Sequence, residues 1–389
     1  MSATAQPALQ TQKLILIVDD TPTNIGVISG ALKDSYRTKI ATNGEKALAL
    51  AGAEEKPDLI LLDIMMPGMD GYEVCTRLKA DAATREIPVI FLTGQTGAED
   101  ETRGFEVGAV DYVHKPFSPA VVKARVRTHI LLREARAQLA AQLDALNQEL
   151  EMARQIQLSI LPHSIPQLAG LDIAARYSPM TSVAGDFYDF IQIDDKHIGI
   201  LIADVSGHGL PSALIASMIQ VALAGQAPHA TEPAKVLAGL NNALTGKFTQ
   251  NFVTAAYIYV DLEKKLIRYA GAGHPPVLRF RNSEGKTSQL LENGIVLGMV
   301  PEAEYTALEI PLEPGDRHIL YTDGIPEAAN PAGEQFGFAR IECYMGARRD
   351  VAAAPFADNF LAEIARWSNQ SSEQGQQDDI TLLVIDYKP

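Results

Sequence analysis

The sequence predicts two domains joined by a helix: an α/β domain with a doubly wound parallel sheet, a long helical connector, and an α+β domain of mostly antiparallel sheet. Three observations carry this prediction. Short apolar runs alternate with amphipathic stretches over residues 13–118, residues 121–160 hold no glycine or proline, and the later strand-like runs follow one another as hairpins. The expected parts are a disordered start at 1–12, domains at 13–118 and 163–389, and a linker at 119–162.

The composition is that of an acidic globular protein. The chain has 389 residues, 47% of them hydrophobic, and a net charge of −15, which argues against nucleic acid or an anionic membrane surface as the main partner. Cys75 and Cys343 fall in different predicted domains, so a reducing cytoplasm is expected rather than a disulfide framework. No apolar run approaches the ~20 residues that span a bilayer, and residues 1–12 lack the blocks of a signal peptide.

Five short apolar runs in the first domain are predicted to be buried strands. They are Lys13–Val18, Arg37–Ala41, Leu59–Leu62, Val89–Leu92 and Val110–Val113. The segments between them are expected to be helices, and five βα repeats in about a hundred residues predict a five-stranded parallel sheet. In such sheets functional residues gather at the carboxyl ends of the strands.

Polar residues of a consistent kind stand at those carboxyl ends: Asp19, Asp20, Asp63, Thr93 and Lys115. Three carboxylates on one rim repel one another unless a divalent cation joins them. A lysine and a hydroxyl beside them could bind a phosphoryl group. One acidic strand end would be explained by solvation, but the five positions together predict a phosphate-accepting site.

This set of residues resembles the receiver domain of response regulators, the CheY-like family, over its full length. The resemblance implies that Asp63 accepts a phosphoryl group from a histidine kinase. It also implies that Asp19, Asp20, Asp63 and the Met65 carbonyl hold Mg²⁺.

The resemblance assigns further roles to three other residues. Thr93 and Lys115 are expected to bind the phosphoryl oxygens, and Tyr112 is the expected switch aromatic. The peptide between Lys115 and Pro116 is expected to be cis. Gly94 stands where the family prefers alanine, which is expected to loosen the loop without abolishing phosphorylation.

The connector carries a heptad-like seam of apolar residues that Pro162 ends. The seam consists of Leu132, Leu139, Leu143, Leu146, Leu150, Ala153 and Ile160. Such spacing favours a parallel dimeric coiled coil, and the alternative is one amphipathic helix packed on its own domain. A stiff helix would also be a mechanical link between the domains. Its end, residues 153–162, resembles the segment that leads into bacterial regulatory phosphatase domains.

The second domain is predicted to be built from hairpins and two helices. The expected strands are Phe187–Ile193, His197–Asp204, Thr254–Val260, Leu266–Ala270, Val277–Arg281, His318–Thr322 and Ile380–Ile385. The expected helices are Leu210–Ala224 and Pro233–Phe248. This order differs from the βα repeats of the first domain and indicates an α+β layout.

Four aspartates stand at strand edges in this domain: Asp186, Asp204, Asp323 and Asp378. Isolated carboxylates in apolar surroundings are costly unless paired or bound to a cation. Oxygen ligands from several strands suit Mg²⁺ or Mn²⁺ rather than zinc. Two such ions acidify a shared water and neutralise phosphoryl oxygens, so the pattern predicts a two-metal hydrolytic site.

These motifs resemble the metal-dependent protein phosphatases of the protein phosphatase 2C fold, in the bacterial sporulation stage-two E branch. The resemblance covers about 153–386 and includes the motifs at 272–276, 297–298 and 322–328. It implies a β-sandwich flanked by helices that holds two or more Mn²⁺ or Mg²⁺ ions. The implied ligands are Asp186, Asp204, the Val205 carbonyl, Asp323 and Asp378.

Two neighbouring positions bear on that resemblance. Asp379 matches a position often held by asparagine and is expected to orient the metal ligands rather than bind metal. Ala184 stands where the family commonly has glycine, which is expected to tighten the entry loop.

Other readings of single motifs are weaker. A lone Thr-Asp-Gly is usually a turn. Ser206 with His208 as base could form a serine nucleophile, but the spacing does not match a nucleophile elbow. His274 could be a general acid or a ligand, but a buried histidine that orders its loop behind the metal ligands is favoured.

The expected function is that of a cytoplasmic response regulator whose output is a serine/threonine phosphoprotein phosphatase controlled through Asp63. By resemblance, its substrate is an anti-sigma-factor antagonist, and it is expected to be a homodimer through the connector. The rival hypothesis is a catalytically silent adaptor that binds a regulatory protein. A decayed domain should have lost an aspartate, and all four remain. A third hypothesis is hydrolysis of a small phosphate ester.

Overall fold

The computed structural model of the chain describes residues 12–94, 98–248, 250–369 and 376–388. The predicted disordered start, residues 1–12, lies outside this range except for Gln12. The chain divides into two compact units, Met1–Ala145 and Leu146–Pro389. No helix in the described ranges is long and apolar enough to cross a membrane.

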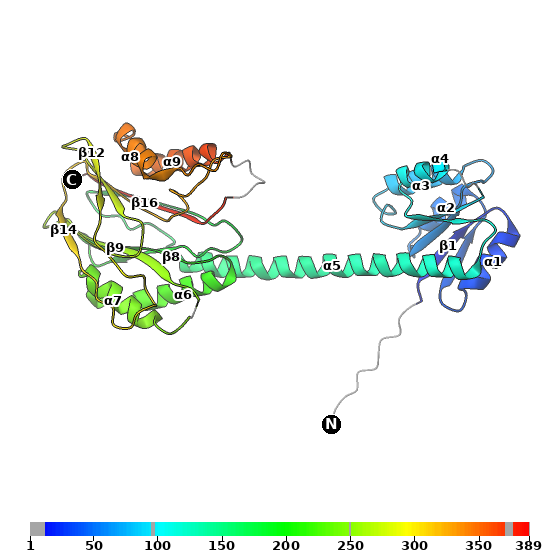
Figure 1. Ribbon diagram of the computed structural model, residues 1–389, viewed down its shortest axis with the longest axis horizontal. Coiled ribbons are helices and arrows are strands. Elements are labelled where there is room, and N and C mark those ends of the chain that lie inside the picture. Colours follow the sequence, from blue (N-terminus) through cyan, green and yellow to red (C-terminus); the bar gives the residue numbers. More distant parts are fainter. Residues whose placement is uncertain (1–11, 95–97, 249, 370–375, 389) are drawn as a thin grey trace, which may run out of the picture. The chain divides into compact units, whose positions relative to one another are not determined.

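The first unit is the predicted doubly wound sheet (Figure 1). Its strands are β1 (Leu14–Val18), β2 (Arg37–Ala41), β3 (Leu59–Asp63), β4 (Val89–Thr93) and β5 (Asp111–His114). The helices between them are α1 (Pro22–Leu32), α2 (Gly44–Ala51), α3 (Gly71–Ala80) and α4 (Ala98–Glu106). The strands are parallel in the order β2-β1-β3-β4-β5. A buried apolar cluster covers each face, which explains why β1, β3 and β4 are buried throughout.

One unbroken helix of 42 residues, α5 (Pro119–Ile160), occupies the predicted connector. Its first turns belong to the core of the first unit, because Val122, Val126 and Ile130 pack beside the strands there. Farther along, Leu139, Leu143 and Leu146 are more than half exposed. The two units divide within this helix, and the domain boundaries predicted from the sequence remain predictions.

The second unit is a sandwich of two sheets flanked by helices, as predicted. One sheet has the order β13-β10-β9-β8-β7 with β14 beside β10, and the other has the order β12-β11-β15-β16-β6. The strands of the first sheet are β7 (Phe187–Gln192), β8 (His197–Val205), β9 (Val253–Asp261), β10 (Leu266–Ala272), β13 (Asn293–Gly294) and β14 (Leu308–Pro311). The second sheet contains β6 (Leu171–Ser178), β11 (Val277–Arg281), β12 (Lys286–Leu290), β15 (Arg317–Tyr321) and β16 (Ile380–Tyr387).

Figure 1 shows the four layers of this unit, with a pair of helices outside each sheet. The helices are α6 (Leu210–Ala224), α7 (Pro233–Leu244), α8 (Gly337–Ala347) and α9 (Ala353–Trp367), with a short 3₁₀ turn, η1 (Ala227–His229). In β16, Leu383 and Ile385 join the core between the sheets, whereas Leu382 and Val384 face the core under α8 and α9. Because its side chains alternate between these two cores, β16 is buried on both faces along its whole length.

Some sequence predictions need correction in this unit. The helix predicted over Pro233–Phe248 ends at Leu244, where the next residue leaves helical geometry and Gly246 has a φ of +74°. Strands β6, β12, β13 and β14 and helices α8 and α9 were not predicted. The burial of β6 shows why, since its residues are mostly half-buried and do not alternate between apolar and polar.

Candidate functional site

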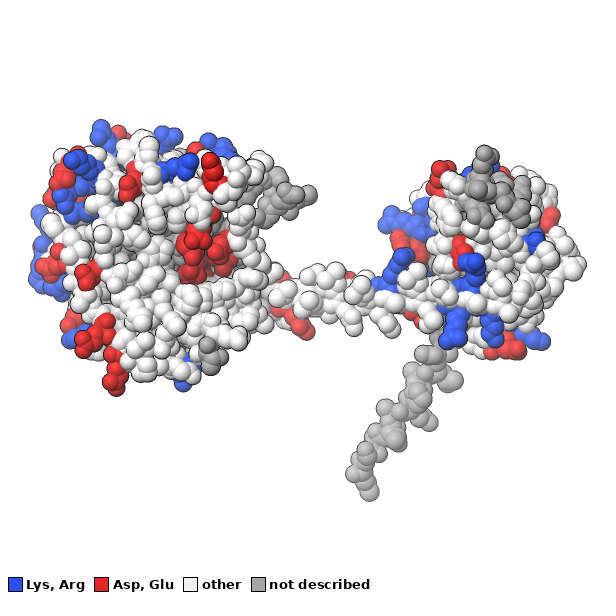
Figure 2. Space-filling model, in the orientation of Figure 1, with Lys and Arg blue, Asp and Glu red and all other residues white. Residues whose placement is uncertain are grey.

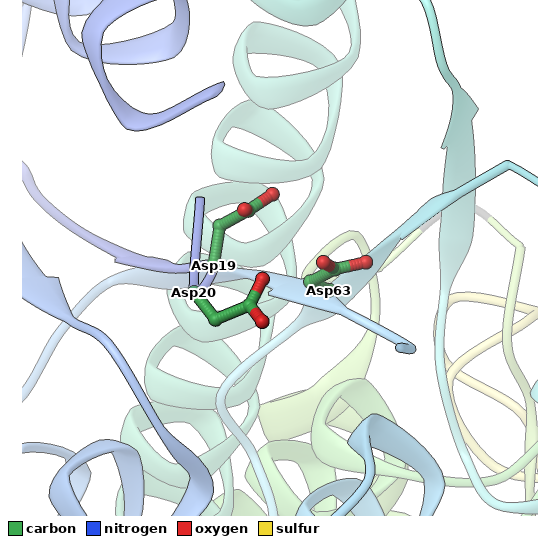
Figure 3. A group of neighbouring side chains, drawn as sticks. All are labelled: Asp19, Asp20 and Asp63. Carbon is green, nitrogen blue, oxygen red and sulfur yellow. The ribbon is translucent and has the colours of Figure 1, made fainter. Parts of the chain in front are cut away.

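The first aspartate cluster lies at the carboxyl edge of the parallel sheet. Asp19 and Asp20 follow β1, and Asp63 is the last residue of β3. Each offers a carboxylate oxygen, and these three oxygens lie within 4.8 Å of one another. Figure 3 shows the carboxylates gathered between the two strand ends. Adjacent parallel strands end together at one edge, which is why residues over forty positions apart meet here.

A lysine side chain completes this cluster. The Lys115 ammonium lies 2.7 Å from Asp63 Oδ2 and 3.0 Å from Asp19 Oδ2. Burial raises the pKa of Asp63, and the Lys115 hydrogen bond partly opposes that shift. Asn24, which the sequence analysis did not single out, donates to both carboxylate oxygens of Asp19 at 3.0 Å. The ammonium contacts two of the three carboxylates, so net negative charge remains and the donor set suits a hard divalent cation.

The other predicted residues of this domain lie around the cluster. Thr93 is buried at the end of β4, and the Lys115 amide donates to its carbonyl at 2.7 Å. Tyr112, in β5, packs edge-on against Phe105. The Met65 amide donates to Asp63 Oδ1 at 3.3 Å. The peptide between Lys115 and Pro116 is cis, as predicted.

The second cluster begins where two strands of a hairpin meet. Asp186 precedes β7 and Asp204 is near the end of β8, in a ladder that pairs Phe187 with Ala203. Asp186 is only 2% exposed, and burial and the Asp204 charge raise its pKa well above the usual range. The hydroxyls of Thr322 and Thr381 both donate to Asp186 Oδ2, at 2.8 and 2.6 Å. These two hydrogen bonds fix the carboxylate in place.

The remaining aspartates, Asp204, Asp323 and Asp378, add negative charge, and no lysine or arginine within the described ranges forms an ion pair with them. Burial, followed by the charges of Asp323 and Asp378, raises the pKa of Asp204 to about 7. Burial and the Asp378 charge raise the pKa of Asp323 to about 6. Gathered carboxylates with raised pKa values fit a site for divalent cations, which would stabilise their charged forms.

The two clusters differ in spacing. Within the described ranges, the first cluster is the one group in which three acidic or metal-ligating side chains bring ligand atoms within 4.8 Å of one another. The second cluster is wider and spread over several strands. Figure 2 shows a compact gathering of Asp and Glu on the surface of the second unit.

Asp379 holds the loop that leads into Asp186. Its two carboxylate oxygens accept hydrogen bonds of 2.7 Å from the backbone amides of Met180 and Gly185. Gly324 packs against it, since a Cβ there would lie 2.1 Å from the Asp379 carbonyl oxygen. The φ of Gly324 is not positive, so this close approach, rather than an unusual turn, explains the glycine.

The Val205 carbonyl faces the same loop. A Cβ on Gly185 would lie 2.7 Å from the Val205 oxygen, so glycine is needed for this approach. Ser206 has a structural contact, because its hydroxyl accepts from the Phe252 amide at 2.9 Å. That bond does not fit the nucleophile hypothesis for Ser206.

His274 is buried beside the cluster and shares a 2.8 Å hydrogen bond with the Thr254 hydroxyl through Nδ1. Burial lowers its pKa to about 3, so the ring is neutral near pH 7. Nε2 has no hydrogen-bond partner among the described residues. His274 and Asp323 both line a cavity of about 390 Å³, and Pro275 and Phe338 also form part of its wall.

Two residues of this site were missed by sequence reasoning. The charge of Glu327 contributes to the raised pKa values of both Asp204 and Asp323. Gln157, near the end of α5, is 5% exposed and holds Ala184 from both sides. Its Nε2 donates to the Ala184 carbonyl at 2.6 Å, and its Oε1 accepts from the Ala184 amide at 3.0 Å. The available signal was its place in the apolar seam, four residues after Ala153 and three before Ile160.

Comparison with known proteins agrees with this geometry. Residues 194–388 match the family described as stage II sporulation protein E, and residues 15–127 match the response regulator receiver domain. The SiaA-PP2C domain of Pseudomonas aeruginosa is similar in structure, with a TM-score of 0.57 and 25% identity, covering 64% of this chain and 100% of that chain. Asp186 lies before residue 194, where the match to the stage II sporulation protein E family begins. Its place in the second cluster therefore rests on the structure.

Three curated relatives show how the similarity is divided. Phosphoserine phosphatase RsbU of Bacillus subtilis is 33% identical over 186 residues, 48% of this chain. Phosphoserine phosphatase RsbP of the same species is 28% identical over 246 residues, 62% of this chain. A probable cyclic di-GMP phosphodiesterase of Vibrio cholerae is 49% identical over 139 residues, 36% of this chain.

The chain spans 55%, 58% and 31% of the lengths of these three relatives. The family match in the second unit covers half of the chain, and the fold and the site agree with it. The chain therefore belongs to the stage II sporulation protein E family and carries a response regulator receiver domain before its phosphatase-type domain.

Proposed function

We propose that this chain is a metal-dependent phosphatase that removes phosphate from phosphoserine or phosphothreonine in a protein and is controlled by its receiver domain. The observation that carries the proposal is the second aspartate cluster. Its four predicted ligands come together from four separate strand ends, and burial and mutual repulsion raise the pKa values of Asp186, Asp204 and Asp323. Two relatives named as phosphoserine phosphatases support the substrate class.

The chemistry follows from the donor set. Asp186, Asp204, Asp323, Asp378 and the Val205 carbonyl would hold Mg²⁺ or Mn²⁺, which when bound supplies an acidified water and neutralises phosphoryl charge. Thr322 and Thr381 keep Asp186 oriented through its Oδ2 atom. Asp379 fixes the backbone just before Asp186. In this proposal His274, neutral and buried, orders its loop rather than transferring a proton.

The input would be phosphorylation of Asp63 by a partner histidine kinase. Asp63 lies beside Lys115, whose ammonium can hold a phosphoryl oxygen once the carboxylate is modified. Thr93 and Tyr112 would respond to that change, with Mg²⁺ on Asp19, Asp20 and the Met65 carbonyl.

The route to the second cluster would run through α5. Gln157 on this helix holds the Ala184 backbone, and the next residue, Gly185, is bound to Asp379. A shift or rotation of the helix would therefore act on the backbone that positions Asp186. This contact gives the proposed mechanical link a physical basis.

A dimer through α5 and a protein substrate complete the proposal. Leu139, Leu143 and Leu146 form an apolar row that is 66%, 56% and 52% exposed, which suits the parallel coiled coil predicted from the heptads. The proposed substrate is a phosphorylated anti-sigma-factor antagonist, as implied by the family resemblance.

A phosphatase assay with Mn²⁺ on a phosphoserine protein tests the proposal. Wild type should release phosphate, EDTA should stop the release, and Asp323→Asn should lose nearly all activity. Asp195→Asn, which makes the same change at an exposed position between β7 and β8, is the matched control. Full activity of Asp323→Asn would overturn the metal assignment, and an inactive wild type that still binds a regulatory protein would favour the adaptor hypothesis.

A further inference from the structure

A cavity of about 520 Å³ lies in the first unit, at the amino ends of β4 and β5. Its lining includes Lys79 of α3, Arg85 and Pro88 before β4, and three residues of α5: Leu132, Arg133 and Arg136. Asp63 is at the carboxyl end of β3, on the opposite edge of this parallel sheet. The cavity is therefore separate from the first aspartate cluster.

Positive charge dominates the cavity wall. Four cations line it, against the carboxylate of Glu86, which lies 3.6 Å from Arg85. Arg133 is also 3.6 Å from the Asp58 carboxylate and donates to the Asp58 carbonyl at 2.6 Å, so Lys79, Arg85 and Arg136 supply most of the available charge. Arg136 makes no ion pair or hydrogen bond to any residue that the structure describes. Figure 2 shows Lys and Arg gathered on this unit along α5.

Lys79 is held in place with one donor to spare. Its ammonium donates to the carbonyls of Arg85 and Ile87, both at 2.8 Å, and an ammonium carries three protons. Burial lowers its pKa, and the nearby Arg133 charge lowers it further. Like charges this close are stabilised by a bound anion. The cavity therefore has a polar side suited to more than one negative charge.

The other side of the cavity is apolar. Pro88, Val110 and Leu132 line it together with two alanines of α5. Its volume falls within the range of about 300–1,000 Å³ that is usual for small-molecule sites. Guanidinium groups bind phosphate oxygens in pairs and also stack on planar rings. Arg85 and Arg136 could therefore bind both the phosphate oxygens and the planar ring of one ligand.

We propose that this cavity binds a nucleoside diphosphate. The cations would bind the diphosphate, and the base would lie against the apolar wall. A bound nucleotide would join the segment between α3 and β4 to α5. Inorganic anions would use only the polar side, whereas a nucleotide would use both the cations and the apolar wall.

Calorimetric titration of the full chain tests this proposal. ADP, GDP, CDP and UDP would each be compared with the matching nucleoside and with pyrophosphate, in EDTA so that no nucleotide binds through a metal at the aspartate clusters. At least one diphosphate should bind with a micromolar Kd, at least tenfold more tightly than its nucleoside and than pyrophosphate. Failure of all four to bind would overturn the proposal, as would equal binding of pyrophosphate.

Two charge reversals on α5 distinguish binding in the cavity from long-range electrostatic attraction to the whole unit. Arg136→Glu should weaken binding at least tenfold. Lys123→Glu changes the charge equally at an exposed position outside the cavity and should leave Kd unchanged. Equal weakening by both variants would show long-range attraction only and would overturn the site. Circular dichroism would confirm that both variants remain folded.

Discussion

The two aspartate clusters use the same side chain in different surroundings. In the first, Asp63 and Asp19 share the Lys115 ammonium at 2.7 and 3.0 Å. In the second, Asp186 is bound by two threonine hydroxyls and feels the charge of Asp204, which in turn lies among the charges of Asp323 and Asp378. A carboxylate beside a lysine can be modified while its charge stays compensated. Buried carboxylates that repel one another are stabilised in their charged form by bound metal ions.

The distances between the carboxylates also differ between the two clusters. The first cluster brings three oxygens within 4.8 Å, a suitable size for one ion, whereas the second is spread over the ends of several antiparallel strands. A tight group beside a lysine suits a single Mg²⁺ and a phosphoryl group on Asp63. A wide group without a lysine suits more than one ion and a water. On the proposed function, one cluster accepts phosphate and the other removes it.

Replacing a single aspartate of either cluster with asparagine should have the largest effect, and it tests whether the two clusters carry different chemistry. Asp204→Asn should lower kcat/KM of the phosphatase by about 10³-fold, because metal-borne charge stabilisation is worth several kcal/mol. It should leave phosphorylation of Asp63 by a small acyl phosphate intact. Asp63→Asn should do the reverse. Phosphate release by the unphosphorylated chain and gel separation of the phosphorylated chain measure the two activities. Loss of Asp63 phosphorylation in Asp204→Asn would contradict the assignment of separate chemistry to the two clusters.

Removing the support behind the second cluster should have a smaller effect. Asp379 accepts from two backbone amides at once, and an asparagine can accept with only one of its two terminal atoms. Asp379→Asn should therefore lower kcat about 10–100-fold, the usual effect of losing a group that orients metal ligands. A raised Mn²⁺ concentration should partly restore activity. Unchanged kcat would show that this loop does not need both hydrogen bonds.

The link between the clusters should be sensitive to one glutamine. Gln157→Leu keeps the size of the side chain but removes two hydrogen bonds to Ala184, each worth about 1 kcal/mol. Phosphorylation of Asp63 changes the phosphatase rate of the wild type by some factor, and we expect this factor to be about tenfold smaller in Gln157→Leu. Gln155→Leu, at an exposed position of the same helix, is the control. If both variants keep the wild-type ratio, the signal does not pass through this contact.

The sequence predicted the first cluster and the sandwich well because strand ends carry clear patterns. Asp19 and Asp63 end buried apolar runs, and Asp186 and Asp204 flank a short hairpin. Gln157 and Asn24 could not be found this way, because neither stands at a strand end. Gln157 acts on the backbone of Ala184, 27 positions away, and Asn24 acts on the Asp19 carboxylate from within α1. The end of α7 was misplaced because the apolar pattern continues past the Thr245 hydroxyl bond to Asn241.

The smallest expected effect is on stability without metal. Since burial and neighbouring charges raise the folded-state pKa of Asp204 to about 7 and of Asp323 to about 6, the folded chain binds more protons than the unfolded chain between about pH 4 and 7. In EDTA the stability of the second unit should therefore fall as pH rises through that window. The loss should appear as a decrease of several degrees in Tm.

Calorimetric unfolding at pH 5 and pH 8 measures this dependence. Asp204→Asn cannot ionise at that position, so its Tm should change less between the two pH values than that of wild type. Mn²⁺ should raise the Tm of wild type most at pH 8, where the carboxylates are charged and bind the ion. An equal effect of Mn²⁺ on Asp204→Asn would mean that the ion stabilises the chain through the first cluster instead, and the contrast between the clusters would not hold.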